Sequence, residues 1–204
     1  AMETLSGFNK VMRDLSGRDK INTLIQECAK LTWFVLNNNK QSPELAAQCL
    51  ALGKGLSLCR SADRFLNATI PLEGFLKIAG SDDVIFIKLP RMLIAFGYII
   101  FFYYDNKIFL GMLGVLKNLD YADLGGKACK LWFYCLCLTL LLQILKMRSD
   151  KEKDEETQLS FYGNCCDVMV AANGSGYLGG SPPIFHILTI ISAIIGIKKL
   201  RLKK

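Results

Sequence analysis

The sequence predicts an all-α protein in which amphipathic helices precede a membrane-embedded helical region with a C-terminal transmembrane helix. Three observations carry this prediction. The chain is 51% hydrophobic and its mean hydropathy is +0.29, which is high for a water-soluble domain. Apolar residues recur every three or four positions in the first third of the chain. After Asp167 no charged residue occurs until Lys198, and a basic tail begins there.

The first long amphipathic helix is expected after Ser16, which is a suitable N-cap. Arg18, Lys20 and Lys30 lie around its polar side. Two interpretations remain open: the helix buries its apolar face in a soluble bundle, or it inserts that face into a bilayer while the three cations contact lipid phosphates. The apolar face consists of Ile21, Leu24, Ile25, Cys28, Leu31 and Val35.

A second helix is predicted to start at Ser42-Pro43-Glu44, because a cap, a first-turn proline and an early acid favour a helix start. Its apolar stripe continues to Leu66, and we expect Gly53 and Gly55 to mark a bend or a close helix contact. Residues 1–83 therefore form the predicted amphipathic region.

Residues 84–148 form a predicted membrane-associated region with two apolar stretches, Met92–Leu116 and Leu131–Leu145. Polar residues 105–107 interrupt the first stretch and would be unfavourable at membrane depth unless they pack inward. The first stretch is therefore either a re-entrant or interfacial hairpin or a crossing, and the second is a thin span or an embedded helix. Residues 118–126 are predicted to be a loop, and residues 149–176 a polar loop and linker.

Residues 177–204 form the predicted transmembrane helix and its basic tail. Tyr177–Ile197 supplies the roughly 20 residues that a bilayer core requires. The cations that follow would keep the C-terminus in the cytosol and contact headgroups; they include Lys198, Lys199 and Arg201. Ser192 and Gly196 form a small-xxx-small pair, which predicts a contact between copies of the chain.

The composition argues against most kinds of catalysis. His186 is the only histidine and it lies in the apolar tail, so we expect no metal site, no histidine-based triad, no catalytic residues and no cofactor. A net charge of +7 admits nucleic acid or anionic lipid as a partner. The apolar segments favour lipid, and we expect no nucleic-acid partner.

Three blocks of the sequence are similar to the peroxin-eleven family of peroxisomal membrane elongation proteins. Residues 15–21 resemble the family's Gly-Arg-Asp-Lys start of its first long helix. Residues 52–65 resemble its small and basic second helix, and residues 104–116 resemble its block of Asp-Asn, aromatic and small residues. Together with the hydrophobic C-terminus, these blocks cover most of the chain in the family's order. The cysteine- and aromatic-rich membrane half looks closest to glycosomal membrane proteins of trypanosomatids.

The resemblance implies a multi-pass protein of the peroxisomal or glycosomal membrane with both termini in the cytosol. Such a protein elongates the membrane before division, raises organelle number and contributes to metabolite passage. Amphipathic-helix insertion, with self-association into homo-oligomers, is the expected mechanism, and fission-machinery proteins are expected partners. The alternative is a channel or transporter for small metabolites, with a path lined by Lys88, Arg91, Asp105 and Lys107. Cytosolic termini require an even number of crossings, whereas three apolar regions compete.

Overall fold

The computed structural model describes residues 9, 11–12, 14–149 and 154–202 of the chain, and these residues contain helices and no strand. The predicted all-α class is therefore confirmed. The helices are α2 (Leu15–Asn38), α3 (Pro43–Asp63), α4 (Thr69–Ala79), α5 (Ile85–Met112), α6 (Tyr121–Ser149), α7 (Glu155–Gly174) and α8 (Pro182–Leu202).

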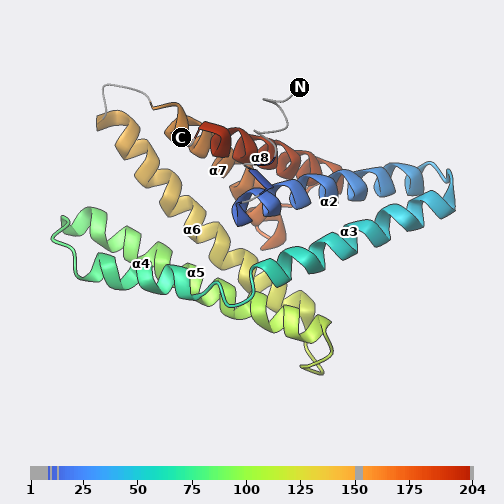
Figure 1. The fold of residues 1–204 in the computed structure, drawn as a ribbon, viewed down its shortest axis with the longest axis horizontal. Helices are drawn as coiled ribbons and strands as arrows, with labels where there is room; N and C mark the ends of the chain where they lie inside the picture. Colours follow the sequence, from blue (N-terminus) through green and yellow to red (C-terminus); the bar gives the residue numbers. More distant parts are fainter. Residues whose placement is uncertain (1–8, 10, 13, 150–153, 203–204) are drawn as a thin grey trace.

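The helices form an open arrangement of hairpins, not one closed bundle (Figure 1). α2 and α3 pair as an arm that projects from the rest, α4 folds back along α5, and α5 crosses α6. α7 packs on both α6 and α8, and α8 also packs against α2. The chain therefore brings its C-terminal helix back to its first long helix.

The starts of α2 and α3 follow local sequence signals, with two changes of detail. α2 is capped by Asp14 in place of Ser16, and the Asp14 side chain accepts a hydrogen bond from the Gly17 backbone N–H at 3.2 Å. α3 begins at Pro43 as predicted, but Ser42 has a left-handed backbone and its side chain makes no cap hydrogen bond. The turn between α2 and α3 therefore ends in a left-handed backbone conformation at Ser42 and not in a side-chain cap.

The apolar middle of the chain contains longer helices than the sequence predicted. α5 is one continuous helix through residues 105–107, which is inconsistent with a hairpin inside 92–116. α6 begins at Tyr121, so most of the predicted 118–126 loop is helical. The cause lies at Asp120, whose side chain accepts from the Asp123 backbone N–H at 3.0 Å. α4 was not predicted as a separate helix, although it lies within residues 1–83, the predicted amphipathic region.

α7 corrects the prediction of a polar loop and linker over residues 149–176. Asp154 caps this helix by accepting hydrogen bonds from the backbone N–H groups of Glu156 and Thr157. Two acids in the first turn favour the positive end of the helix dipole. Gly163, Ala171 and Ala172 are buried, so α7 packs closely against its neighbours. The other region boundaries stay predictions.

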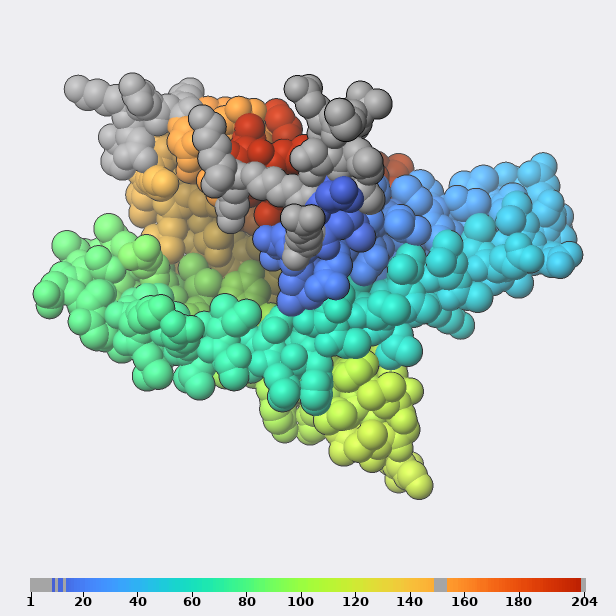
Figure 2. Space-filling model, in the orientation of Figure 1, coloured from blue at the N-terminus to red at the C-terminus, as the bar shows by residue number. Residues whose placement is uncertain are grey.

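Large apolar side chains are exposed on many of the helices. In the space-filling view the α2–α3 arm projects from the rest of the molecule (Figure 2). α5, α6 and α8 are each long and apolar enough to cross a membrane, yet only 11%, 17% and 17% of their most apolar windows are buried within the chain. Phe86, at the start of α5, is 84% exposed. Helices this apolar and this exposed are typical of a lipid-facing surface.

The α5–α6 crossing depends on a missing side chain at Gly97. A Cβ atom at this position would lie 2.4 Å from the Sγ atom of Cys135, which is buried in α6. We therefore expect Gly97→Ala to lower the free energy of unfolding by about 1–3 kcal/mol through overpacking. Thermal or denaturant unfolding of the detergent-solubilised protein measures this, and Cys135→Ala should restore part of the loss.

Gly55→Ala is the matched control for this prediction, because a Cβ at Gly55 meets nothing within 4 Å. It should leave stability unchanged or raise it by up to about 1 kcal/mol through helix propensity. Equal losses at Gly97 and Gly55 would contradict the proposed close contact.

Candidate membrane-binding surface

The predicted membrane-inserting side of α2 lies on the outside of the fold. Ile25 and Val35 are 44% and 47% exposed, and Cys28 between them is exposed. Ile21, Leu24 and Leu31 on the same side are half-buried. We call these six residues the outer face of α2. No described helix covers the centre of this face.

The opposite side of α2 is polar and buried. Thr23, Gln26 and Glu27 are buried there together with Ala29, against α3 and α8. α2 is therefore reversed relative to a helix of a water-soluble bundle, which buries its apolar side. Six residues that interact on this side form what we call the α2 polar cluster: Asp19, Gln26, Glu27, Lys30, Arg60 and His186.

Glu27 is the centre of the α2 polar cluster and is only 5% exposed. One carboxylate oxygen accepts from the Lys30 ammonium and from the Gln26 amide, both at 2.8 Å. The other oxygen lies 2.6 Å from Nδ1 of His186 in α8. Because an ionised carboxylate only accepts hydrogen bonds, Nδ1 of His186 is the donor.

Arg60 of α3 closes the α2 polar cluster from the other side. Its Nε donates to Asp19 at 2.8 Å, and a terminal nitrogen donates to the Gln26 amide oxygen at 3.2 Å. The approach of α3 is close, because a Cβ at Gly53 would lie 3.1 Å from Lys30 Cγ. The predicted close contact is thus made at Gly53, whereas Gly55 faces open space.

Burial would by itself raise the pKa of Glu27, since it disfavours the charged carboxylate. Hydrogen bonds and charges from Lys30 and His186 outweigh this effect and bring the pKa below its ordinary value of 4.5. Glu27 is therefore ionised at neutral pH, and its pairing stabilises the contact of α2 with α8.

A second ion pair joins the amphipathic helices to the apolar ones. Arg64, just after α3, donates two hydrogen bonds of 3.0 Å to the two carboxylate oxygens of Asp105 in α5. Asp105 therefore packs inward, as the sequence analysis required for a charge in this stretch. Lys107 lies over the Tyr103 ring, 5.0 Å from its centroid, as a cation–π contact.

The cations predicted to contact headgroups lie in different surroundings. Arg18 and Arg201 are exposed, whereas Lys30 pairs with Glu27. Lys198 and Lys199 pair with the first two acids of α7, at 2.9 and 3.6 Å. The stem of Lys20 crosses α8 at Gly196.

The small residues predicted to form an oligomer contact line a cavity inside the chain. Ser192 is buried, and Gly196 faces the carbon stem of Lys20. The contact between copies of the chain stays a prediction.

Two features of this surface were missed by sequence reasoning. α4 carries exposed apolar residues, among them Ile70, Leu72 and Leu76, which continue the apolar surface of α5. His186 was treated as part of an apolar tail, although it binds Glu27. A helix of 11 residues gives a weak periodic signal, and the partner of His186 is 159 residues away in the sequence.

Replacing Glu27 by Gln should destabilise the α2–α8 contact by about 1–3 kcal/mol at pH 7, because the buried charge pairs are lost. The folded-state pKa of Glu27 is below 4.5, so its pairing stabilises the fold above that pH and is lost as pH falls through the lower value. The difference between wild type and variant should therefore shrink below about pH 4.5. Thermal unfolding in detergent at several pH values measures this.

Glu73→Gln is the control for Glu27→Gln, since Glu73 forms a fully exposed pair with Lys77 in α4. We expect no measurable change in unfolding temperature. A loss at Glu27 that is no greater than that at Glu73, or that stays constant down to pH 3, would refute the role assigned to the α2 polar cluster.

Comparison with known proteins gives one match. The family model for Peroxisomal biogenesis factor 11 (PEX11) matches residues 5–160, which is more than half of the chain and includes α2 to α6. No curated protein and no solved structure matches. The chain therefore belongs to the PEX11 family of non-enzymatic organelle-biogenesis factors, and its general role is in proliferation of the peroxisomal membrane.

Proposed function

We propose that this protein elongates the peroxisomal membrane by inserting the outer face of α2 into the bilayer. The observation that carries the proposal is the burial pattern of α2: Ile25, Cys28 and Val35 on its outer face are exposed, whereas Gln26 and Glu27 are buried. Added volume in one leaflet favours positive curvature, and such curvature elongates a membrane. Arg18 is exposed near the start of this helix and is suited to contact headgroup phosphates.

The driving force is the transfer of exposed aliphatic side chains out of water. Full burial of a large aliphatic side chain is worth about 1.5–3 kcal/mol, so the half-exposed residues of the outer face each contribute a part of that. The exposed apolar residues of α4 add to the same process. Self-association would concentrate these helices, and homo-oligomers and fission-machinery proteins remain proposed partners.

The packing of α7 supports a topology with both termini in the cytosol. Glu155 at the start of α7 pairs with Lys198 near the end of α8, and Gly174 at its end lies against Cys129 near the start of α6. α7 therefore runs the full depth of α6 and α8. Among the described helices, α5, α6 and α8 are apolar enough to cross a membrane. We propose that the more polar α7, which packs on α6 and α8, makes a further pass, so that four passes give the even number that cytosolic termini require.

The channel alternative receives less support from the geometry. Lys88 donates to the Ser81 carbonyl, Arg91 pairs with Asp83, and Asp105 pairs with Arg64. Arg91 and Asp105 are 14 residues apart in one helix, which is roughly 21 Å. Each of these charged residues has a local partner. They also lie at different depths along the fold, so they do not line one continuous path.

The insertion proposal predicts that charges on the outer face abolish membrane elongation. Ile25→Asp combined with Val35→Asp should prevent the purified full-length chain from elongating proteoliposomes, because each carboxylate opposes insertion by up to about 3 kcal/mol. Cryo-electron microscopy of the vesicles measures their shape. The variant should still reside in the membrane, because α5, α6 and α8 are unchanged.

The control carries the same two charges elsewhere on α2, as Ser16→Asp and Asn22→Asp, and should elongate vesicles as wild type does. Elongation that survives charges on the outer face, or that is lost equally in the control, would be inconsistent with insertion through that face.

The four-pass topology predicts opposite locations for the two ends of α7. A protease site inserted between residues 151 and 152 should be cut by external protease on intact peroxisomes. A site between Gly179 and Gly180 should be cut only after the membrane is permeabilised. The reverse pattern, or equal cleavage at both sites, would exclude a pass made by α7.

A further inference from the structure

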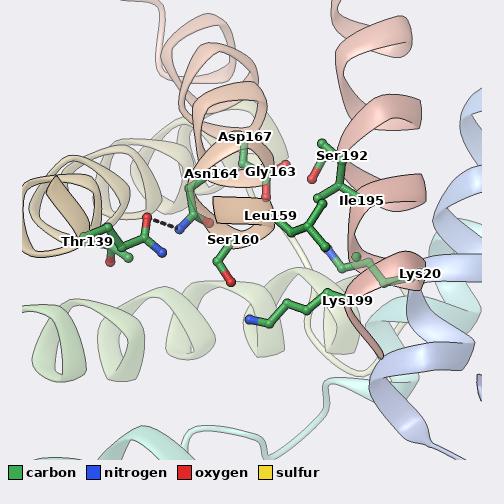
Figure 3. Close-up of a pocket in the computed structure, with 12 residues that line it drawn as sticks. Lys20, Thr139, Leu159, Ser160, Gly163, Asn164, Asp167, Ser192, Ile195 and Lys199 are labelled. Atoms are coloured by element: carbon green, nitrogen blue, oxygen red, sulfur yellow. Dashed lines mark hydrogen bonds between the residues drawn. The ribbon is translucent and has the colours of Figure 1, made fainter. Parts of the chain in front are cut away.

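A polar cavity of about 330 Å³ lies between α6, α7 and α8, and Lys20 of α2 reaches it (Figure 3). Its polar lining comes from several helices, with Gln143 on α6, Asn164 on α7 and Ser192 on α8. It extends from the middle of α8 to Lys199, near the basic end of that helix. One end of the cavity therefore lies near the level of the lipid headgroups if α8 crosses the membrane.

Two opposite charges line this cavity without partners in the described part of the chain. Lys20 and Asp167 make no hydrogen bond or ion pair there, either with each other or with other residues. Lys199 adds a second cation, and its contact with Glu156 is long, at 3.6 Å. Unpaired charges of both signs around one cavity are complementary to a ligand that carries both signs itself.

The Lys20 side chain can reach the cavity because residue 196 is glycine. A Cβ at position 196 would lie 3.0–3.2 Å from three carbons of the Lys20 stem, so the glycine lets that stem cross α8 closely. On the opposite wall, Asn164 donates to Gln143 at 3.1 Å, which holds α7 against α6 (Figure 3). The positive and negative groups are thus presented from separate helices.

We propose that this cavity binds a phosphate that also carries a primary ammonium group, and that its source is the headgroup of phosphatidylethanolamine. Lys20 and Lys199 bind the phosphate, and Asp167 accepts hydrogen bonds from the ammonium. The choline headgroup of phosphatidylcholine has no N–H group that could donate to Asp167. Phosphatidic acid has no ammonium group at all. Leu159 and Ile195 also line the cavity and give the upper acyl chains an apolar contact. Lipid binding in this cavity does not require insertion of the outer face of α2. Disproof of either proposal therefore leaves the other unaffected.

The test is native mass spectrometry of the full-length chain released from detergent micelles. Phosphatidylethanolamine, phosphatidylcholine and phosphatidic acid of matched acyl chains are each titrated, and soluble phosphoethanolamine is added as competitor. We expect saturable binding of one phosphatidylethanolamine, about tenfold tighter than either of the other lipids. Soluble phosphoethanolamine should compete only weakly.

Two near-isosteric variants separate the two charges of the ligand. Lys20→Met should weaken both phosphatidylethanolamine and phosphatidic acid, because both carry the phosphate. Asp167→Asn should weaken phosphatidylethanolamine by about tenfold and leave phosphatidic acid unchanged or tighter. Gly196→Ala keeps every charge and should weaken phosphatidylethanolamine by displacing the Lys20 stem.

The controls are Lys54→Met and Lys77→Met, which remove exposed cations that do not line the cavity and should leave binding unchanged. Equal, non-saturable binding of all three lipids would overturn the site. Unchanged phosphatidylethanolamine binding in Asp167→Asn would overturn the ammonium contact. Full competition by soluble phosphoethanolamine would overturn the lipid as the source of the ligand.

Discussion

The burial of Glu27 is the constraint on which the arrangement of the N-terminal half depends. A buried carboxylate is strongly unfavourable unless charged or hydrogen-bonding partners surround it. The partners here are Lys30 on the same helix and His186 on α8, and both lie on one side of α2. That side must face inward, so the apolar side faces outward. An outward apolar side is unfavourable in water and favourable in lipid, which links one buried acid to the environment of the whole helix.

Ion pairs also explain why the chain does not separate into an amphipathic half and a membrane half. Arg64 and Asp105 join the end of α3 to α5, while Glu27 and His186 join α2 to α8. Glu27 and Asp105 are largely shielded from water in these pairs, so a lost partner is more damaging there than at a water-exposed surface. The α2–α3 arm is therefore attached to the membrane helices at two charged points, and its movement relative to them is restricted.

Local signals in the sequence were sufficient for the helices whose patterns repeat regularly. The start of α3 at Pro43 and the residues that make up the apolar face of α2 could be inferred from neighbouring residues. The position of Asp105 in an apolar stretch gave the condition that it pack inward, and the structure meets that condition. Side-chain partners could not be inferred, because His186 and Glu27 are 159 positions apart. The cavity was missed for the same reason, since Lys20 and Asp167 line one cavity only when α2, α7 and α8 pack together.

α7 shows why average polarity is a poor guide to the depth of such a helix. Its 20 residues span roughly 30 Å, the thickness of a bilayer core, but its polar residues suggested a solvated linker. Two of those residues face inward, because Asn164 is bonded to Gln143 and Asp167 lines the cavity. Its exposed positions include Tyr162 and Met169, which are compatible with lipid. In both α2 and α7, inward polar residues such as Glu27 and Asn164 serve contacts within the chain, so the average polarity of a helix does not describe its outward side.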